Sequence, residues 1–194
     1  MYLVRPPFFL KWYYPNLIWN KSTKEKIVYL TFDDGPIPDV TDFVLNTLKN
    51  FNVKATFFCI GDNISKNPKV FEHIKSEGHA IGNHTYNHLK GWKTDDKTYL
   101  ENFWKCQELT QSNLFRPPYG RIKKSQIRKL AHSWLPMAIG MAVDNNKITK
   151  QYNNSTLQIV MWDVLSGDFD TSLSPEKCYQ NVVKNVRNGS IIVF

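Results

Sequence analysis

The sequence predicts an α/β fold built on a parallel sheet. Runs rich in β-branched and aromatic residues alternate along the chain with segments whose apolar residues recur at helical spacing. The first such run, Ile27–Phe32, is nearly all apolar, which is typical of a strand buried on both faces of a parallel sheet. The 194 residues fit one domain but are few for an eight-stranded barrel, which takes about 250 residues.

The remaining elements follow from local patterns. Strands are predicted at the runs Lys54–Ile60, His79–Gly82, Asn113–Arg116, Thr156–Val164 and Ser190–Phe194. Helices are predicted from Pro38 to Phe51, Asn67 to Gly78, Thr94 to Gln111, Ser125 to Ala131 and Ser174 to Gly189. Asn67 and Ser174 are typical helix caps that precede a proline, and Gly78 and Gly189 are typical of helix ends.

Two segments differ from this alternation. Residues 1–25 form an N-terminal arm, and we expect four of its aromatic side chains to pack onto the domain of residues 26–194: Phe8, Phe9, Trp12 and Tyr13. Because prolines and charges interrupt the arm, it does not resemble a signal peptide, and a cytoplasmic location is the default, with a cell-envelope role left open. Residues 132–155 are expected to be an insertion that either borders a substrate groove or is a surface excursion.

Charge and composition exclude several classes of protein. The 25 basic and 17 acidic residues give a net charge of +8, but the basic residues are scattered, which does not favour a nucleic-acid partner. No apolar run approaches the roughly 18–20 residues that span a membrane. The three cysteines contain no CxxC pair, so neither a disulfide framework nor a cysteine zinc site is predicted. The oligomeric state stays open.

Two adjacent carboxylates, Asp33 and Asp34, follow the first predicted strand. Two carboxylates at a buried strand end are costly unless they are paired or bind a metal. The following Gly35 and Pro36 also suit a simple turn, which is the alternative interpretation.

Two histidines, His84 and His88, follow the strand predicted at His79–Gly82. Side chains at i and i+4 share one face of a helical turn and can bind one metal, although such pairs also occur by chance at surfaces. The carboxyl ends of parallel strands converge on one face of the sheet. One carboxylate and two imidazoles would then form a three-ligand set that suits Zn²⁺ or a neighbouring first-row metal.

Two further segments bring polar side chains to predicted strand ends. Arg116 precedes Pro117 and Pro118, which stiffen the loop, and a surface arginine beside a rigid turn is the alternative. The segment Trp162–Asp170 contains three acids and an aromatic residue, and there a turn or a helix cap is the alternative.

In combination these segments resemble the polysaccharide deacetylase family, which is carbohydrate esterase family 4 and carries the NodB homology domain. The resemblance covers roughly residues 26–194. The family's first four motifs are matched in order by Thr31–Pro36 (TFDDGP), His84–His88 (HTYNH), Arg116–Tyr119 (RPPY) and the region Trp162–Phe169. The resemblance implies an α/β fold of a particular kind, a distorted (β/α) barrel of about seven parallel strands.

The resemblance also implies roles for individual residues. Asp34, His84 and His88 are implied to bind a divalent metal, with zinc first and cobalt or nickel as alternatives. Asp33 is implied to be the general base, and Arg116 is implied to pair with Asp33 and orient it.

The substrate contacts implied by the resemblance are Pro118, Tyr119 and Trp162, with the backbone N–H of Tyr119 helping to hold the oxyanion. Asp168 is implied to orient a catalytic histidine from a fifth motif, one or two residues beyond a hydrophobic strand. That strand is the predicted one that ends at Phe194, where the sequence stops. We therefore expect a barrel truncated at its C-terminus and without its general acid, because none of the five histidines fits that place.

The expected function is that of a metal-dependent hydrolase acting on an acetylated glycan. It would remove N-acetyl groups from N-acetylglucosamine units of chitooligosaccharides or peptidoglycan, with metal-bound water as nucleophile and Asp33 as base. One alternative is a carbohydrate-binding homologue without catalysis, which the absent histidine favours. The other is an O-acetyl esterase on acetylated xylan, because an ester leaves without strong acid help. The glycan, its chain length and the metal stay open.

Overall fold

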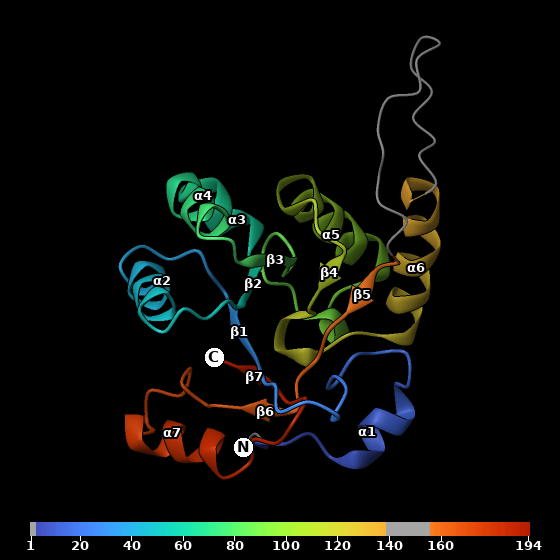
Figure 1. The fold of residues 1–194 in the computed structure, drawn as a ribbon. Coiled ribbons are helices and arrows are strands. Elements are labelled where there is room, and N and C mark those ends of the chain that lie inside the picture. Colours follow the sequence, from blue (N-terminus) through green and yellow to red (C-terminus); the bar gives the residue numbers. More distant parts are fainter. Residues whose placement is uncertain (1–2, 139–155) are drawn as a thin grey trace.

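The computed structural model describes residues 3–138 and 156–194, which form one curled sheet with helices around its outside (Figure 1). Its seven strands pair in parallel in the order β5-β4-β3-β2-β1-β7-β6. The strands are β1 (Tyr29–Asp33), β2 (Thr56–Cys59), β3 (Ala80–Asn83), β4 (Leu114–Phe115), β5 (Gln158–Ile159), β6 (Val164–Leu165) and β7 (Ile191–Val193). The prediction of an α/β fold with about seven parallel strands is confirmed.

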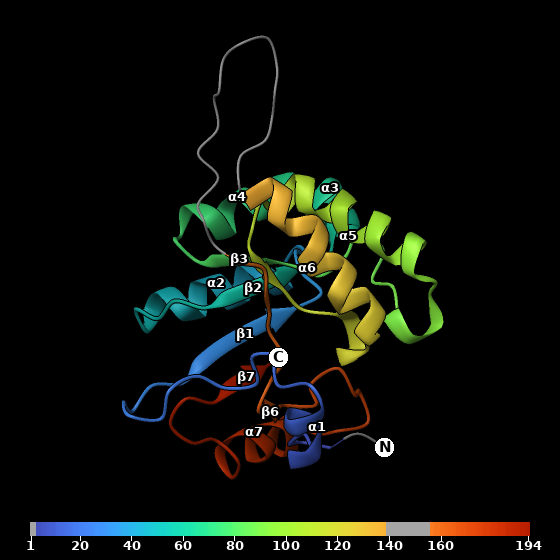
Figure 2. The ribbon, with the colours of Figure 1, turned by 90° about the vertical axis from the view of Figure 1, so that its right-hand side faces the viewer.

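The helices begin close to the signals in the sequence, but the helix predicted to reach Gly189 ends at Val183. Ser174 accepts a hydrogen bond from the N–H of Lys177 and caps one helix, and Gly78 adopts a φ of 75° after another. The helices are α1 (Phe8–Tyr13), α2 (Val40–Asn50), α3 (Gly61–Lys66), α4 (Pro68–Ser76), α5 (Asp96–Thr110), α6 (Lys124–Ala138) and α7 (Pro175–Val183), with short 3₁₀ helices η1 (Gly91–Lys93) and η2 (Pro118–Gly120). Figure 2 shows α3 to α6 toward one end of the sheet and α1 and α7 toward the other.

Helix α6 is longer than predicted and includes the first residues of the expected insertion. It extends through residues 132–138, and residues 139–155 of that segment lie outside the described ranges. The short helix α3 was not expected, because its segment between two stronger elements carries no apolar stripe. No helix in the described ranges is both long and apolar enough to cross a membrane.

The single strand predicted over Thr156–Val164 is wrong, because this segment forms parts of two strands. β5 pairs with β4 at one edge of the sheet, and β6 pairs with β7 at the other. Only the residues Val160–Asp163 separate the two strands along the chain, so the sheet curls until its edges approach each other. Ile18 of the N-terminal arm pairs with Val160 at the gap between these edges.

The N-terminal arm is held by other side chains than those expected. Phe8 and Trp12 are 85% and 82% exposed, so the expectation that they pack onto the domain is wrong, whereas Tyr13, about half exposed like Phe9, contacts Lys124 of α6. Helical spacing places Leu10 and the following Tyr14 on the opposite side of α1, toward the core. The arm residues that contact the hydrophobic core under α5 and α6 are Leu10, Tyr14, Leu17 and Trp19.

Candidate active site

Asp34, His84 and His88 come together at the carboxyl ends of β1 and β3. These strands lie on either side of β2 and run parallel to it, so their ends share one face of the sheet. One donor atom from each residue lies within 4.8 Å of the other two. Oδ1 of Asp34 is 3.4 Å from Nε2 of His84 and 3.1 Å from Nε2 of His88. The fold therefore places the three predicted ligands in one cluster.

The hydrogen bond of His84 fixes which ring nitrogen faces the cluster. The buried ring has its Nδ1 atom 2.7 Å from the backbone carbonyl oxygen of Arg116. Because a carbonyl oxygen only accepts, Nδ1 donates this hydrogen bond, and Nε2 is the ring nitrogen that faces Asp34. The His88 ring lies against the ring of Tyr119, with centroids 4.5 Å apart.

The chemistry of the cluster fits a divalent first-row metal ion. One carboxylate oxygen and two imidazole nitrogens leave further coordination positions open for water and substrate. Burial would raise the pKa of Asp34, but hydrogen bonds to His84 and His88 and their charges outweigh burial and lower this pKa well below its usual range. The carboxylate is therefore in the ionised form that a metal requires.

Arg116 is fully buried, which excludes the alternative of a surface arginine. Its Nη1 atom donates to Oδ1 of Asp33 and to the hydroxyl of Thr31, both at 2.7 Å. Its Nε and Nη2 atoms donate to the carbonyl oxygens of Val160 and Met161 at 3.1 and 2.9 Å. Burial lowers the pKa of Arg116, and the charge of Asp33 opposes this effect. The guanidinium is therefore held by β1 on one side and by the connection between β5 and β6 on the other.

The two adjacent carboxylates have different surroundings. Oδ1 of Asp33 is bound by Arg116, and Oδ2 lies 4.0 Å from Nε2 of His84. The side chain of Asp33 is 15% exposed and that of Asp34 is 52% exposed. Arg116 thus holds one oxygen of Asp33, and the other oxygen of Asp33 faces the cluster that contains Asp34.

The predicted substrate contacts lie beside this cluster. The Tyr119 ring is half exposed, and in the described part of the chain its backbone N–H has no hydrogen-bond partner. Pro118 is buried, and Trp162 packs on Gly120, where an added Cβ atom would lie 2.5 Å from the indole ring. Asp168 is exposed and accepts a hydrogen bond from the hydroxyl of Ser166. Its role in orienting a histidine stays a prediction.

Of the five histidines in the chain, only His84 and His88 reach the site. His73 pairs with Asp42 on the surface, and His79 accepts a hydrogen bond from the backbone N–H of Ala55, which precedes β2. His132 lies on the exposed side of α6. The carboxyl end of β7 is close to the site, because the carbonyl oxygen of Phe194 accepts a hydrogen bond from the N–H of Asp33 at 3.0 Å.

Sequence reasoning missed the asparagines that shape the site's turns. Asn83 is fully buried at the end of β3, and its side-chain oxygen accepts a hydrogen bond from the N–H of Thr85 at 2.8 Å. Asn63 donates to the carbonyl oxygen of Asp34 at 2.6 Å. The position of Asn83, directly before His84, was the signal in the sequence that could have identified it. Nothing near Asn63 in the sequence indicated its contact with Asp34.

Comparison with known proteins agrees with this arrangement. The sequence profile of the family described as polysaccharide deacetylase matches residues 20–135. A peptidoglycan-N-acetylglucosamine deacetylase of Bacillus cereus is 35% identical over 172 residues, which are 86% of this chain and 54% of the relative. A chitooligosaccharide deacetylase of Azorhizobium caulinodans is 31% identical over 180 residues, which are 89% of this chain and 75% of the relative.

A solved structure shares the fold. The crystal structure of the Bc1960 peptidoglycan N-acetylglucosamine deacetylase, in complex with a hydroxamate, superposes with a TM-score of 0.78 and 31% sequence identity. The match covers 95% of this chain and 78% of the solved chain. This chain spans about half the length of the first Bacillus cereus relative.

Proposed function

The chain belongs to the polysaccharide deacetylase family, and we propose that it is a metal-dependent hydrolase that removes N-acetyl groups from N-acetylglucosamine units of a glycan. One observation carries this proposal: the Asp33 carboxylate, held by a buried arginine, lies beside a cluster of one carboxylate and two imidazoles. Relatives named as peptidoglycan and chitooligosaccharide deacetylases support the substrate class, and we favour peptidoglycan.

In this proposal Asp34, His84 and His88 hold Zn²⁺, with Co²⁺ or Ni²⁺ as alternatives. When bound there, the cation would polarise the acetyl carbonyl group and lower the pKa of a water molecule. The carbonyl of Arg116 keeps the Nδ1 proton of His84 in place, so that Nε2 stays available.

Asp33 acts as the general base in this proposal. Its free oxygen Oδ2 faces the cluster, where it can accept the proton of the attacking water. Arg116 fixes the orientation of Asp33 through Oδ1. The unpartnered N–H of Tyr119 is positioned to donate a hydrogen bond to the developing oxyanion.

The leaving amine needs a proton, because an amide anion is a very poor leaving group. Neither His84 nor His88 is free for this step if both bind the metal. Since Phe194 contacts Asp33, a histidine one or two residues beyond Phe194 would emerge beside the site. We infer that a histidine appended at that place would act as the proton donor and would raise the rate of amide hydrolysis.

Acetate release tests the proposal. The protein is stripped of metal with a chelator, reloaded with Zn²⁺, Co²⁺ or Ni²⁺, and assayed on soluble peptidoglycan strands and N-acetylglucosamine oligomers. Release should depend on the metal, should disappear in Asp33→Asn and should persist in the surface control Asp42→Asn. No release with any metal, by this chain or by one with a histidine appended after Phe194, would overturn the proposal.

The lack of a third histidine at the site favours an O-acetyl esterase as the second candidate. An alkoxide leaves with less acid help than an amide anion, so the groups present would suffice for an ester. Acetate release from acetylated xylan, with none from N-acetylated glycans, would assign this function. Glycan binding without release from either substrate would indicate a non-catalytic binding protein.

A further inference from the structure

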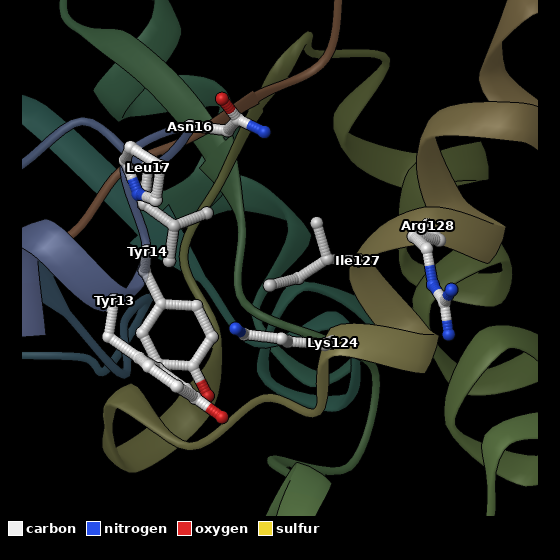
Figure 3. Close-up of a pocket in the computed structure, with 8 residues that line it drawn as sticks. Tyr13, Tyr14, Asn16, Leu17, Lys124, Ile127 and Arg128 are labelled. Atoms are coloured by element: carbon white, nitrogen blue, oxygen red, sulfur yellow. The ribbon is translucent and has the colours of Figure 1, made fainter.

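A cavity lies apart from the candidate active site. It has a volume of about 350 Å³ and is formed by the end of α1, the residues that follow it and the first turns of α6 (Figure 3). In Figure 3 the side chains of Ile127 and Lys124 point from α6 toward Tyr13 and Tyr14 on the opposite wall. The N-terminal arm thus forms one wall of this cavity, and α6 forms the opposite wall.

The wall chemistry of this cavity suits a flat ligand that carries negative charge. The rings of Tyr13 and Tyr14 meet edge to face, with centroids 4.9 Å apart, and Nζ of Lys124 lies 3.5 Å over the Tyr13 ring. Asn16 adds an amide that can both donate and accept hydrogen bonds. None of the eight lining residues is acidic, and no carboxylate in the described part of the chain pairs with Lys124 or Arg128.

The cavity is linked to the candidate active site by a band of aromatic and cationic side chains. The carbonyl oxygen of Ile122 accepts hydrogen bonds from the hydroxyl of Tyr14 at 3.4 Å and from the indole of Trp92 at 3.1 Å. The guanidinium of Arg121 lies 4.2 Å over the half-exposed Trp92 ring. Arg121 follows the turn that carries Tyr119, whose ring contacts His88.

We propose that this cavity anchors a glycan strand that bears carboxylates while another unit of the same strand occupies the candidate active site. Sugar rings offer flat C–H faces for the tyrosines, and Lys124 complements a carboxylate of the strand. This inference rests on the proposed function, because it names the class of strand on which the site acts. An anionic membrane is a different partner, and the exposed Phe8 and Trp12, which lie outside the cavity, are the side chains it would contact.

The test compares substrates of two lengths. We compare kcat/KM for soluble peptidoglycan strands of several disaccharides with kcat/KM for a short, neutral N-acetylglucosamine oligomer. In Tyr13→Ala and Lys124→Ala the ratio of the long-strand to the short-oligomer value should fall about two- to tenfold, mainly through a higher KM. Tyr13→Phe should restore the ratio, and added salt should reduce it in the unmodified protein.

Matched surface controls are Tyr179→Ala on α7 and Lys97→Ala on α5, which line no part of the cavity. An unchanged ratio in both cavity variants, with normal thermal unfolding, would overturn the inference. The inference would also be overturned if Tyr13→Ala and Lys124→Ala lost binding to vesicles of anionic lipid while their kinetics on long strands stayed normal. Strand binding is also followed by calorimetry, so if the protein releases no acetate, loss of binding in Tyr13→Ala still supports the anchoring site although the proposed function fails.

Discussion

Replacing Arg116 by methionine tests the role proposed for Asp33 apart from the roles proposed for the metal ligands. The methionine keeps an apolar stem against the Phe58 ring, over which the guanidinium lies at 4.1 Å. It removes the cation that binds Asp33 and the hydrogen bonds to Thr31 and two backbone carbonyls. Because removing one partner of a buried ion pair costs about 3–5 kcal/mol, we expect the free energy of unfolding to fall by about that amount.

Urea unfolding followed by tryptophan fluorescence measures this loss. With a slope of about 2 kcal/mol per molar urea, the midpoint should fall by about 2 M. Arg128→Met, which alters an exposed arginine, is the matched control and should change stability by less than about 0.5 kcal/mol. The double variant Asp33→Asn/Arg116→Met should be more stable than the two single losses predict when added, by at least about 1 kcal/mol.

The same variant tests how the two halves of the site are connected. His84 bonds to the backbone carbonyl of residue 116, which the substitution leaves in place. We therefore expect Co²⁺ affinity to change less than about tenfold, while acetate release falls by about 10²-fold or more because Asp33 is no longer oriented. A stability loss below about 1 kcal/mol, additive single losses, or equal losses of metal affinity and activity would each refute the reasoning.

Three further predictions concern the site's support. Burial would raise the pKa of Asp163, but Lys11, Ser190 and Arg187 lower it to about 2. The stability that Asp163 contributes is therefore complete above the usual pKa of 3.8 and is lost as pH falls toward 2. Asp163→Asn should thus lower the free energy of unfolding by about 2 kcal/mol at pH 7, and far less at pH 2, by urea unfolding. His88→Ala should weaken Co²⁺ binding about 10²-fold by absorption titration, whereas the surface variant His73→Ala should not. Gly82→Ala would place a Cβ atom 2.3 Å from the Phe58 ring and should cost about 1–3 kcal/mol in thermal unfolding.

The sequence predicted five of the strands, including β7, whose partner β1 is distant along the chain, and failed at one run that forms parts of two strands. β1, β2, β3 and β4 are neighbours in both sequence and space, and each apolar run there corresponds to one strand. The run Thr156–Val164 is equally apolar, but its two ends pair at opposite edges of the sheet. Hydrophobic pattern reports burial and not the partner strand, so the break at Val160–Asp163 was invisible.

At the site, the sequence predicted which side chains meet but not what holds them. Motif order and strand ends were enough to bring Asp34, His84 and His88 into one cluster. The tautomer of His84 depends on a backbone carbonyl 32 residues away, and a carbonyl has no signature in sequence. The prediction for the aromatic side chains of the N-terminal arm failed for a related reason. Helix α1 has six residues, which are too few for apolar spacing to show which side of the helix faces the core.

The left-handed backbone conformation of Asp34 explains how two neighbouring carboxylates both approach His84. Successive residues of a strand point to opposite faces, so a continued strand would separate Asp33 from Asp34. Asp34 instead adopts a φ of 66°, and carboxylate oxygens of both residues lie within 4.0 Å of Nε2 of His84. Thr85, His88 and Tyr119 also have φ between 55° and 61°, and each such residue costs about 1–2 kcal/mol. The segments that carry Asp34, His84 and Arg116 each contain such a residue, so the local geometry of these segments is unfavourable. The free energy that maintains it must come from the buried contacts of Arg116 and the hydrophobic clusters beside the sheet.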